Sequence, residues 1–241
     1  LEGQDFLMVQ PFTSDEKKNW GTKNYVDLLR ILSQFLPRVK MVVSGAPFER
    51  DQLEQFAQDC EQAGVSLQVV ICSFEGALSL VKRAQMIITG DTCIKHMAAA
   101  TDAKIIELSI GSSHLHKTGA YKQDSIIVQA KTACAPCGHR DQCPFSEHPC
   151  AADVSPEAVA SVVVQMMDNQ WSGLKSVAEE FSDKMDIYRT HRLGSGIWSA
   201  LPLADNHLAL EDVLDRVSWR FLLSGSGHKS LFPFGSVGEE L

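Results

Sequence analysis

Short apolar runs alternate with segments of helical periodicity over roughly the first 130 residues. The apolar runs are rich in β-branched residues and predict strands at 6–9, 40–43, 67–71, 86–89, 104–108 and 125–128. Between them, apolar residues recur every three or four positions and predict helices at 25–35, 49–63 and 75–84 and a short one ending at Ala100. Strands that are almost wholly apolar and are separated by helices indicate a parallel sheet covered on both faces. The pattern therefore predicts a Rossmann-like α/β domain.

The character of the sequence changes after residue 130. A loop at 131–150 is rich in Cys, Pro, His and Gly, and Ser155 is predicted to cap a helix that begins at Pro156 and continues to Met167. Helical spacing then recurs in two sets, Leu174, Val177, Ala178, Phe181, Met185 and Tyr188, and Leu210, Val213, Leu214, Val217 and Phe221. The stretch 193–206 between them reads as a connection, and the last fifteen or so residues as a poorly ordered tail. We expect a Rossmann-like domain at 1–167, including the 131–150 loop, and a C-terminal helical extension and tail at 168–241.

Charge and cysteine content narrow the function classes. The 241 residues carry a formal net charge of −8, which disfavours a nucleic-acid partner because an acidic surface repels phosphate backbones. No apolar run approaches the roughly 18 residues of a membrane span, and residues 1–5 lack the pattern of a signal peptide. Three of the seven cysteines, Cys60, Cys72 and Cys93, lie among apolar residues in what read as core surroundings. This usage favours a reducing cytoplasm over a disulfide framework.

Polar residues follow the first predicted strand, at the edge of the sheet where ligands bind in open parallel sheets. Thr13 and Ser14 supply hydroxyls, Lys18 supplies charge, and Trp20 leads into the next helix. Such a loop suits a pyrophosphate, which accepts hydrogen bonds and carries negative charge. Taken alone, the loop is more typical of a capped helix start with solvated lysines.

A second polar segment follows the fourth predicted strand. Gly90, Asp91 and Thr92 are small residues that let the chain turn and let a phosphate approach the amides of the next helix. His96 follows Thr92 by four positions, so both lie on one face of the first helical turns. An Asp/Thr cap with a hydrogen-bonded histidine would give the same pattern.

Taken together, the loops resemble one family. Thr-Ser-x-x-x-Lys-x-Trp at 13–20, Gly-Ala-Pro-x-Glu at 45–49 and Asp-Thr-x-x-x-His-Met-Ala-Ala-Ala at 91–100 are similar to motifs of glycosyltransferase family nine, the ADP-heptose:lipopolysaccharide heptosyltransferases. The resemblance covers about residues 5–165 and implies the C-terminal, nucleotide-sugar-binding half of a GT-B fold. It implies contacts with the diphosphate and sugar from Thr13, Ser14 and Lys18, with the nucleoside from Glu49, and with the sugar and phosphates from Asp91, Thr92, Cys93 and His96. Cys93 stands where the family usually has glycine, which leaves the identity of the sugar open.

The resemblance also implies an activity. It indicates an inverting glycosyltransferase of bacterial lipopolysaccharide or surface glycan assembly, cytoplasmic and peripheral at the inner membrane. In a GT-B enzyme the acceptor and the catalytic base belong mainly to an N-terminal domain of about 150 residues, so no catalytic residue is expected in this chain. Lys18 and the amides after Asp91 would stabilise the departing diphosphate, so transfer would need no metal cofactor. The expected partners are ADP-heptose or a similar donor, the missing N-terminal domain, and a glycan, lipid A-core or protein acceptor.

Four cysteines of the 131–150 loop form a separate candidate site. Cys134 and Cys137 make a Cys-x-x-Cys pair, Cys143 and Cys150 follow, and His139 and His148 are substitute ligands. Four thiolates suit tetrahedral zinc or iron in a structural site. Family members often carry similar cysteines, and the branch that glycosylates autotransporter adhesins uses a four-cysteine iron finger. The alternative is a surface loop with oxidised or free thiols.

Two other functions remain open. A non-catalytic nucleotide-binding or assembly module, with the cysteine loop and C-terminal helices contacting other proteins, is favoured by Cys93. A GT-B sugar-nucleotide epimerase would share the fold but gives no account of the cysteine loop. The glycosyltransferase is favoured by five retained residues: Lys18, Glu49, Asp91, Thr92 and His96.

Overall fold

A computed structural model describes residues 6–192 and 198–204, which form an eight-stranded sheet in the order β3-β2-β1-β4-β5-β6-β7-β8. The parallel strands are β1 (Phe6–Gln10), β2 (Lys40–Gly45), β3 (Leu67–Ile71), β4 (Met86–Thr89), β5 (Lys104–Ser109) and β6 (Ile126–Ala130). The strand order reverses between β1 and β4, and such a switch point is where open α/β sheets bind ligands. The predicted Rossmann-like α/β fold is confirmed.

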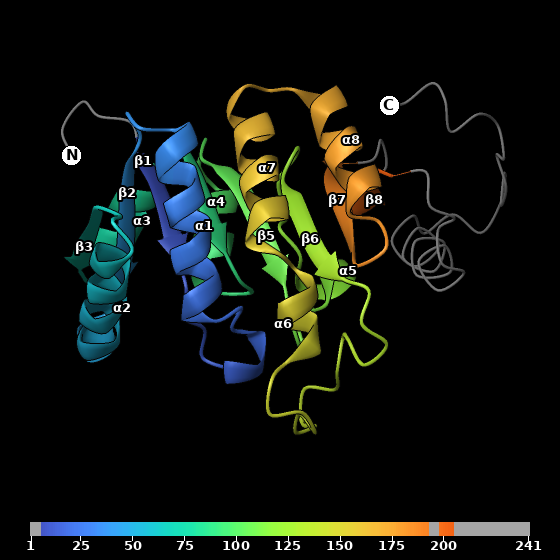
Figure 1. Ribbon diagram of the computed structural model, residues 1–241, viewed down its shortest axis with the longest axis horizontal. Helices are drawn as coiled ribbons and strands as arrows, with labels where there is room; N and C mark the ends of the chain where they lie inside the picture. The colour runs from blue at the N-terminus through green and yellow to red at the C-terminus, as the bar shows by residue number, and fades with distance from the viewer. Residues whose placement is uncertain (1–5, 193–197, 205–241) are drawn as a thin grey trace, which may run out of the picture.

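Helices cover both faces of this sheet (Figure 1). One layer consists of α1 (Thr22–Phe35), α2 (Arg50–Gln62), α7 (Pro156–Met167) and α8 (Trp171–Glu180), and the other of α3 (Phe74–Val81) and α4 (Cys93–Ala99). Side chains of β1 alternate between the two cores: Leu7 packs in the first, and Phe6 and Met8 in the second. Every residue of β1 is buried, as the almost wholly apolar strands predicted.

Local signals place several element ends where the sequence predicted them. The Ser155 hydroxyl accepts a hydrogen bond from the Ala158 amide at 3.2 Å, and α7 begins at Pro156. Past the end of α2, Gly64 has a φ of +77°, the left-handed conformation that glycine adopts at no steric cost. Within the described ranges, 6–192 and 198–204, no helix is long and apolar enough to cross a membrane.

The helical period predicted as far as Tyr188 is wrong beyond Glu180. Residues Met185–Arg192 form β7, antiparallel to β6, and Trp198–Pro202 form β8, antiparallel to β7. Met185 and Tyr188 are three positions apart and so also fit a helix, but the free edge of β6 offers ladder hydrogen bonds that outweigh a weak local preference.

The strand β8 also corrects the connection predicted at 193–206. The sheet that was predicted within residues 1–167 therefore continues to Pro202. The boundary between two domains after residue 167 stays a prediction. The helix expected around 210–221 and the tail lie outside the described residues.

Candidate functional site

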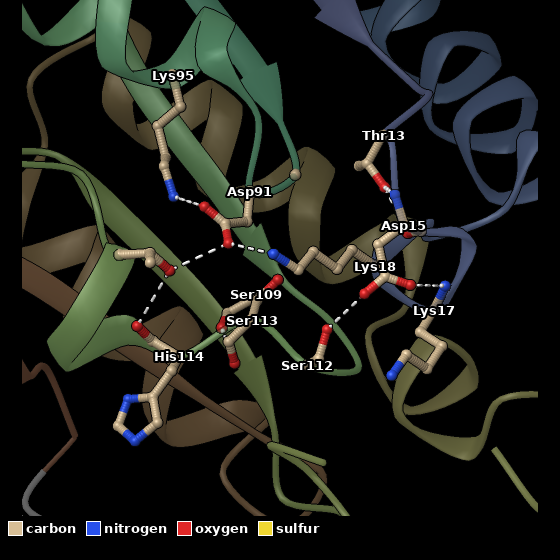
Figure 2. A network of polar contacts seen from close by, with 12 residues as sticks. Thr13, Asp15, Lys17, Lys18, Asp91, Lys95, Ser109, Ser112, Ser113 and His114 are labelled. Atoms are coloured by element: carbon tan, nitrogen blue, oxygen red, sulfur yellow. Dashed lines mark hydrogen bonds and ion pairs between the residues drawn. The ribbon is translucent and has the colours of Figure 1, made fainter. Parts of the chain in front are cut away.

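Three loops meet at the carboxyl edge of the sheet beside the switch point. The first follows β1 and contains the 3-10 helix η1 (Glu16–Lys18), the second is the turn from β4 into α4, and the third follows β5 and leads into α5 (Leu115–Thr118). Figure 2 shows the polar contacts that join them. We refer to this part of the sheet edge, between the three loops, as the cleft, and it is the candidate site.

Asp91 lies at the centre of these contacts, between two lysines (Figure 2). The Lys18 Nζ is 2.7 Å from Asp91 Oδ2, and the Lys95 Nζ is 2.6 Å from Asp91 Oδ1. The Thr118 hydroxyl also donates to Asp91 Oδ2, at 3.0 Å. Burial raises the pKa of Asp91, but Lys95 and Lys18 outweigh burial and bring the pKa down to about 2. Asp91 is therefore ionised at neutral pH.

The loop after β1 is shaped by short side chains that bond their own backbone. The Asp15 carboxylate accepts from the Lys17 amide at 3.2 Å and so caps η1, while the Thr13 hydroxyl donates to the Asp15 carbonyl at 2.6 Å. The Asn19 side chain accepts from the Thr13 amide at 2.9 Å. These bonds fix the turn from which Lys18 reaches Asp91.

Glycines let the three loops approach closely. A Cβ on Gly90 would lie 3.2 Å from the Thr13 methyl carbon and 3.4 Å from the Lys18 carbonyl. Gly111, in the loop after β5, has a φ of +60°, and a Cβ there would lie 2.0 Å from the Lys17 carbonyl. A side chain at Gly111 would displace η1 and the lysine that it carries.

The loop after β5 forms a third wall that the sequence reasoning missed. The Ser112 hydroxyl donates to Asp15 Oδ2 at 2.9 Å (Figure 2). Burial raises the pKa of Asp15, but the bond from Ser112 and the charges of Lys17 and Lys18 lower it below its usual value. The signal was present, because Gly111, Ser112 and Ser113 lie within five residues of the end of the fifth predicted strand.

The structure brings some of the predicted residues together. Thr13, Lys18, Asp91 and Thr92 line the same cleft, with Thr92 joined to the Thr89 hydroxyl at 3.0 Å. Their assignment as donor-binding residues stays a prediction.

Other predicted residues have neighbours elsewhere. Glu49 Oε2 accepts from the Ala46 amide at 2.8 Å and so caps η2 (Pro47–Glu49), which is a local structural role. Ser14 is exposed. Trp20, the last residue of the first loop motif, is 2% exposed and donates to the Val154 carbonyl at 2.8 Å, so it belongs to the core.

Two predicted residues lie on the outward side of α4. Cys93 is exposed, and its predicted core surroundings are wrong because Ile94, Met97 and Ala98 make up the apolar buried side of this helix. The His96 ring stacks on Tyr121 with centroids 6.3 Å apart and the planes 24° apart. Burial and the Lys95 charge lower the pKa of His96 against the opposing effect of Asp91, so its imidazole is mainly uncharged at neutral pH.

The most deeply buried charges lie behind Asp91. Lys95 and Glu107 are both 0% exposed, and the Lys95 Nζ is 2.7 Å from Glu107 Oε1. The other Glu107 oxygen accepts from the Ala120 amide at 2.8 Å. Burial raises the pKa of Glu107, and Lys95 only partly offsets it. Sequence reasoning missed both residues, although a glutamate inside an apolar strand was the available signal.

The four cysteines of the 131–150 loop line one cavity of about 30 Å³, shared with Lys17 and Gly111. Burial raises the pKa of the Cys150 thiol, and the three other cysteines of the loop raise it further. A hydrogen bond from the Gly111 backbone lowers it but does not cancel these effects. Within the part of the chain that the structure describes, all cysteines are free. No group of three or more His, Cys, Asp or Glu side chains in the same part is placed to hold a metal ion. The shared cavity fits the prediction, but the side-chain arrangement is not that of a ligand set.

Lys17 joins this loop to η1. Its Nζ donates to the carbonyls of Gly138, His139 and Asp141 at 3.1, 2.9 and 2.6 Å. The Cys137 amide donates to the Gly111 carbonyl at 3.0 Å. The cysteine loop, at the bottom of Figure 1, therefore contacts two of the three loops of the cleft.

Comparison with known families decides the relationship of the chain. The family model described as glycosyltransferase family 9 (heptosyltransferase) matches residues 2–147, more than half of the chain. The chain belongs to glycosyltransferase family 9. Among proteins of curated function, none matches it.

Solved structures of similar fold include three heptosyltransferases. Escherichia coli ADP-heptose lipopolysaccharide heptosyltransferase II is 15% identical with a TM-score of 0.56, covering 70% of this chain and 48% of its own. E. coli heptosyltransferase WaaC with ADP is 18% identical with a TM-score of 0.52, covering 68% and 45%. The dodecameric iron-containing heptosyltransferase TibC, in complex with ADP-D-β-D-heptose, is 12% identical with a TM-score of 0.52, covering 70% and 47%.

At sequence identities of 12–18%, these similarities show that the fold is shared and nothing more. The chain spans about half the length of the solved structures that it matches. The predicted family and fold class are confirmed. The family match ends at residue 147, before Cys150, α7 and the antiparallel strands.

Proposed function

We propose that this chain binds the nucleotide-sugar donor of a heptosyltransferase-like glycosyltransferase, with ADP-heptose or a close relative as the donor, in bacterial lipopolysaccharide or surface glycan assembly. The observation that carries the proposal is the Lys18 ammonium, held 2.7 Å from Asp91 at the carboxyl edge of the sheet beside the switch point. Family membership and the nucleotides in the matched structures point in the same direction.

The chemistry of the cleft suits a diphosphate joined to a sugar. Lys18 supplies positive charge, and the Thr92 hydroxyl, which shares a hydrogen bond with Thr89 in which either oxygen can donate, is a donor for a phosphate oxygen. An ionised Asp91 only accepts hydrogen bonds, so it suits sugar hydroxyls rather than phosphate oxygens. One cleft therefore offers groups for both parts of the donor.

Titration calorimetry tests the proposal. We expect ADP and ADP-heptose to bind at least about tenfold, or 1.4 kcal/mol, more tightly than UDP or GDP. Adenosine is the matched control, and its affinity should be far lower because it lacks the diphosphate. Absence of binding heat with every nucleotide at millimolar concentration would contradict the proposal. Equal affinity for ADP and ADP-heptose would favour the nucleotide-binding module, in which the exposed Cys93 occupies the place of a sugar-contacting glycine.

We also propose that Cys134, Cys137, Cys143 and Cys150 bind one structural zinc or iron ion per chain. Supporting this, all four line one cavity and lie close in sequence, so closing the loop around an ion costs little entropy. The four side chains would have to rearrange to form the ligand set. The loop has few apolar residues, and an ion would supply order that core burial does not.

Elemental analysis of protein purified without added metal checks this proposal. We expect about one equivalent of zinc or iron, lost in Cys137→Ser and kept in Cys72→Ser, which changes a thiol outside the loop. Less than about a tenth of an equivalent, together with four freely titrating thiols, would favour a plain surface loop.

A further inference from the structure

The buried pair Lys95 and Glu107 lies directly behind the cleft. We infer that these two are positioning residues: Lys95 fixes Asp91 from behind and takes part of its charge, and Glu107 holds Lys95 in place, so that Lys18 keeps positive charge for a bound diphosphate. The inference rests on the proposed function and extends it to residues that touch no ligand. Both side chains are 0% exposed, so any effect on binding must pass through Asp91 or its neighbours.

A closed ring of contacts holds Asp91 in place. Lys95 contacts Asp91 at 2.6 Å and Glu107 at 2.7 Å. The Glu107 carboxylate accepts a hydrogen bond from the Ala120 amide at 2.8 Å. Thr118, two residues before Ala120 in the chain, donates to Asp91 at 3.0 Å and so completes the ring. The ring joins α4, β5 and the end of α5, so Asp91 is held by three elements rather than by its own turn.

The positions of the two lysines around Asp91 determine how strongly Lys18 can attract a phosphate. Figure 2 shows Lys95 and Lys18 approaching Asp91 from opposite sides, one at each carboxylate oxygen. With Lys95 in place, its ammonium group contacts both Glu107 and Asp91, so the Asp91 charge does not act on Lys18 alone. Without Lys95, the full negative charge of Asp91 would act on Lys18. The neutralised Lys18–Asp91 ion pair would then attract an incoming phosphate less strongly.

Stability alone does not explain the pair. Removing two charges from water is costly, and replacing a buried ion pair by apolar residues of similar volume is often neutral or stabilising. A purely structural pair would act equally on the fold whether or not Asp91 is charged. A positioning pair acts on ligand binding only while Asp91 carries its charge.

A double-mutant cycle separates these roles. ADP affinity is measured by titration calorimetry for Lys95→Gln/Glu107→Gln and for Lys95→Met/Glu107→Leu, each with and without Asp91→Asn. Circular dichroism and thermal unfolding identify which variants are folded. The charge-neutral control is Asp124→Asn/Arg189→Gln, which removes an ion pair of 2.7 Å at the opposite end of β6.

We expect the Lys95/Glu107 replacements to weaken ADP binding about fivefold or more when Asp91 is present, the lower end of ordinary coupling between groups. With Asp91→Asn the same replacements should change affinity by less than about twofold, and the Asp124/Arg189 control should bind ADP like the native chain. Equal losses in both backgrounds, or unchanged affinity in a folded variant, would overturn the inference.

A second measurement needs no ligand. In the native protein, carbon-13 NMR should show the Asp91 carboxyl titrating near pH 2, because the charges of Lys95 and Lys18 lower its pKa. His96 and Glu107 are the other titratable groups beside Asp91, and the charges of Lys95 and Asp91 act on both of them. In Lys95→Gln/Glu107→Gln the Asp91 midpoint should rise, and an unchanged midpoint would overturn the inference. Failure of the native chain to bind ADP would instead refute the proposed function, and this titration would still decide the role of the pair.

Discussion

Mixed with ADP-heptose and a suitable acceptor, the 241-residue chain by itself is expected to transfer no sugar. The acidic groups near the cleft are poorly suited to removing a proton from an acceptor hydroxyl. Asp91 has a pKa of about 2 and is paired with two lysines, while Glu107 is 0% exposed. The chain also spans only about half the length of the heptosyltransferases that it matches.

Supplying the other half should restore transfer. A general base contributes about 10²- to 10⁴-fold to rate, so adding a partner domain should raise turnover from undetectable to readily measured. Transfer of radiolabelled heptose is the measurement, and the same reconstituted protein carrying Lys18→Ala is the control for dependence on this cleft. Turnover by the isolated chain with a defined acceptor would refute the assignment of this part as donor-binding only.

Replacing Lys18 by alanine is expected to weaken ADP binding by about 1.5–3 kcal/mol, the range for a charge-assisted hydrogen bond. At about 1.4 kcal/mol per tenfold, this is a loss of more than tenfold in affinity. The effect is large because the Lys18 side chain is only 17% exposed and is fixed by Asp91 before any ligand arrives. Titration calorimetry measures it.

Lys23→Ala is the matched control. It removes the same charge from a side chain that is 89% exposed and paired with Asp27 on the surface of α1. Surface pairs of this kind contribute little, so ADP affinity should change by less than about twofold. Unchanged affinity in Lys18→Ala would remove Lys18 from the binding site.

The sequence predicted the parts of the fold that depend on local pattern. The strands 67–71 and 86–89 and the start of α7 at Pro156 agree with the structure because short apolar, β-branched runs and N-capping residues are local signals in the sequence. Thr13, Lys18 and Asp91 were expected in one cleft because carboxyl ends of parallel strands share an edge.

Features that depend on contacts between distant elements were missed. Nothing near Lys95 in the sequence indicates that it pairs with Glu107 across the α4–β5 connection. Trp20 fitted the family motif, but its ring packs edge to face on Tyr25, 5.0 Å away, and so serves the core. The sequence of Met185–Arg192 fits both a helix and a strand, and it forms a strand because it pairs with the free edge of β6.

The pairing of β6 with β7 has a consequence for the order of folding. β6 finds its parallel partner β5 in the preceding segment, but its antiparallel partner is synthesised only after α6 (Pro149–Asp153), α7 and α8. Until then Ile126, Ile127 and Val128 belong to an unprotected, apolar edge strand, the kind that recruits other chains. Completion of the sheet is thus a late, long-range step, and the helices made in between bring the closing strand to the growing edge.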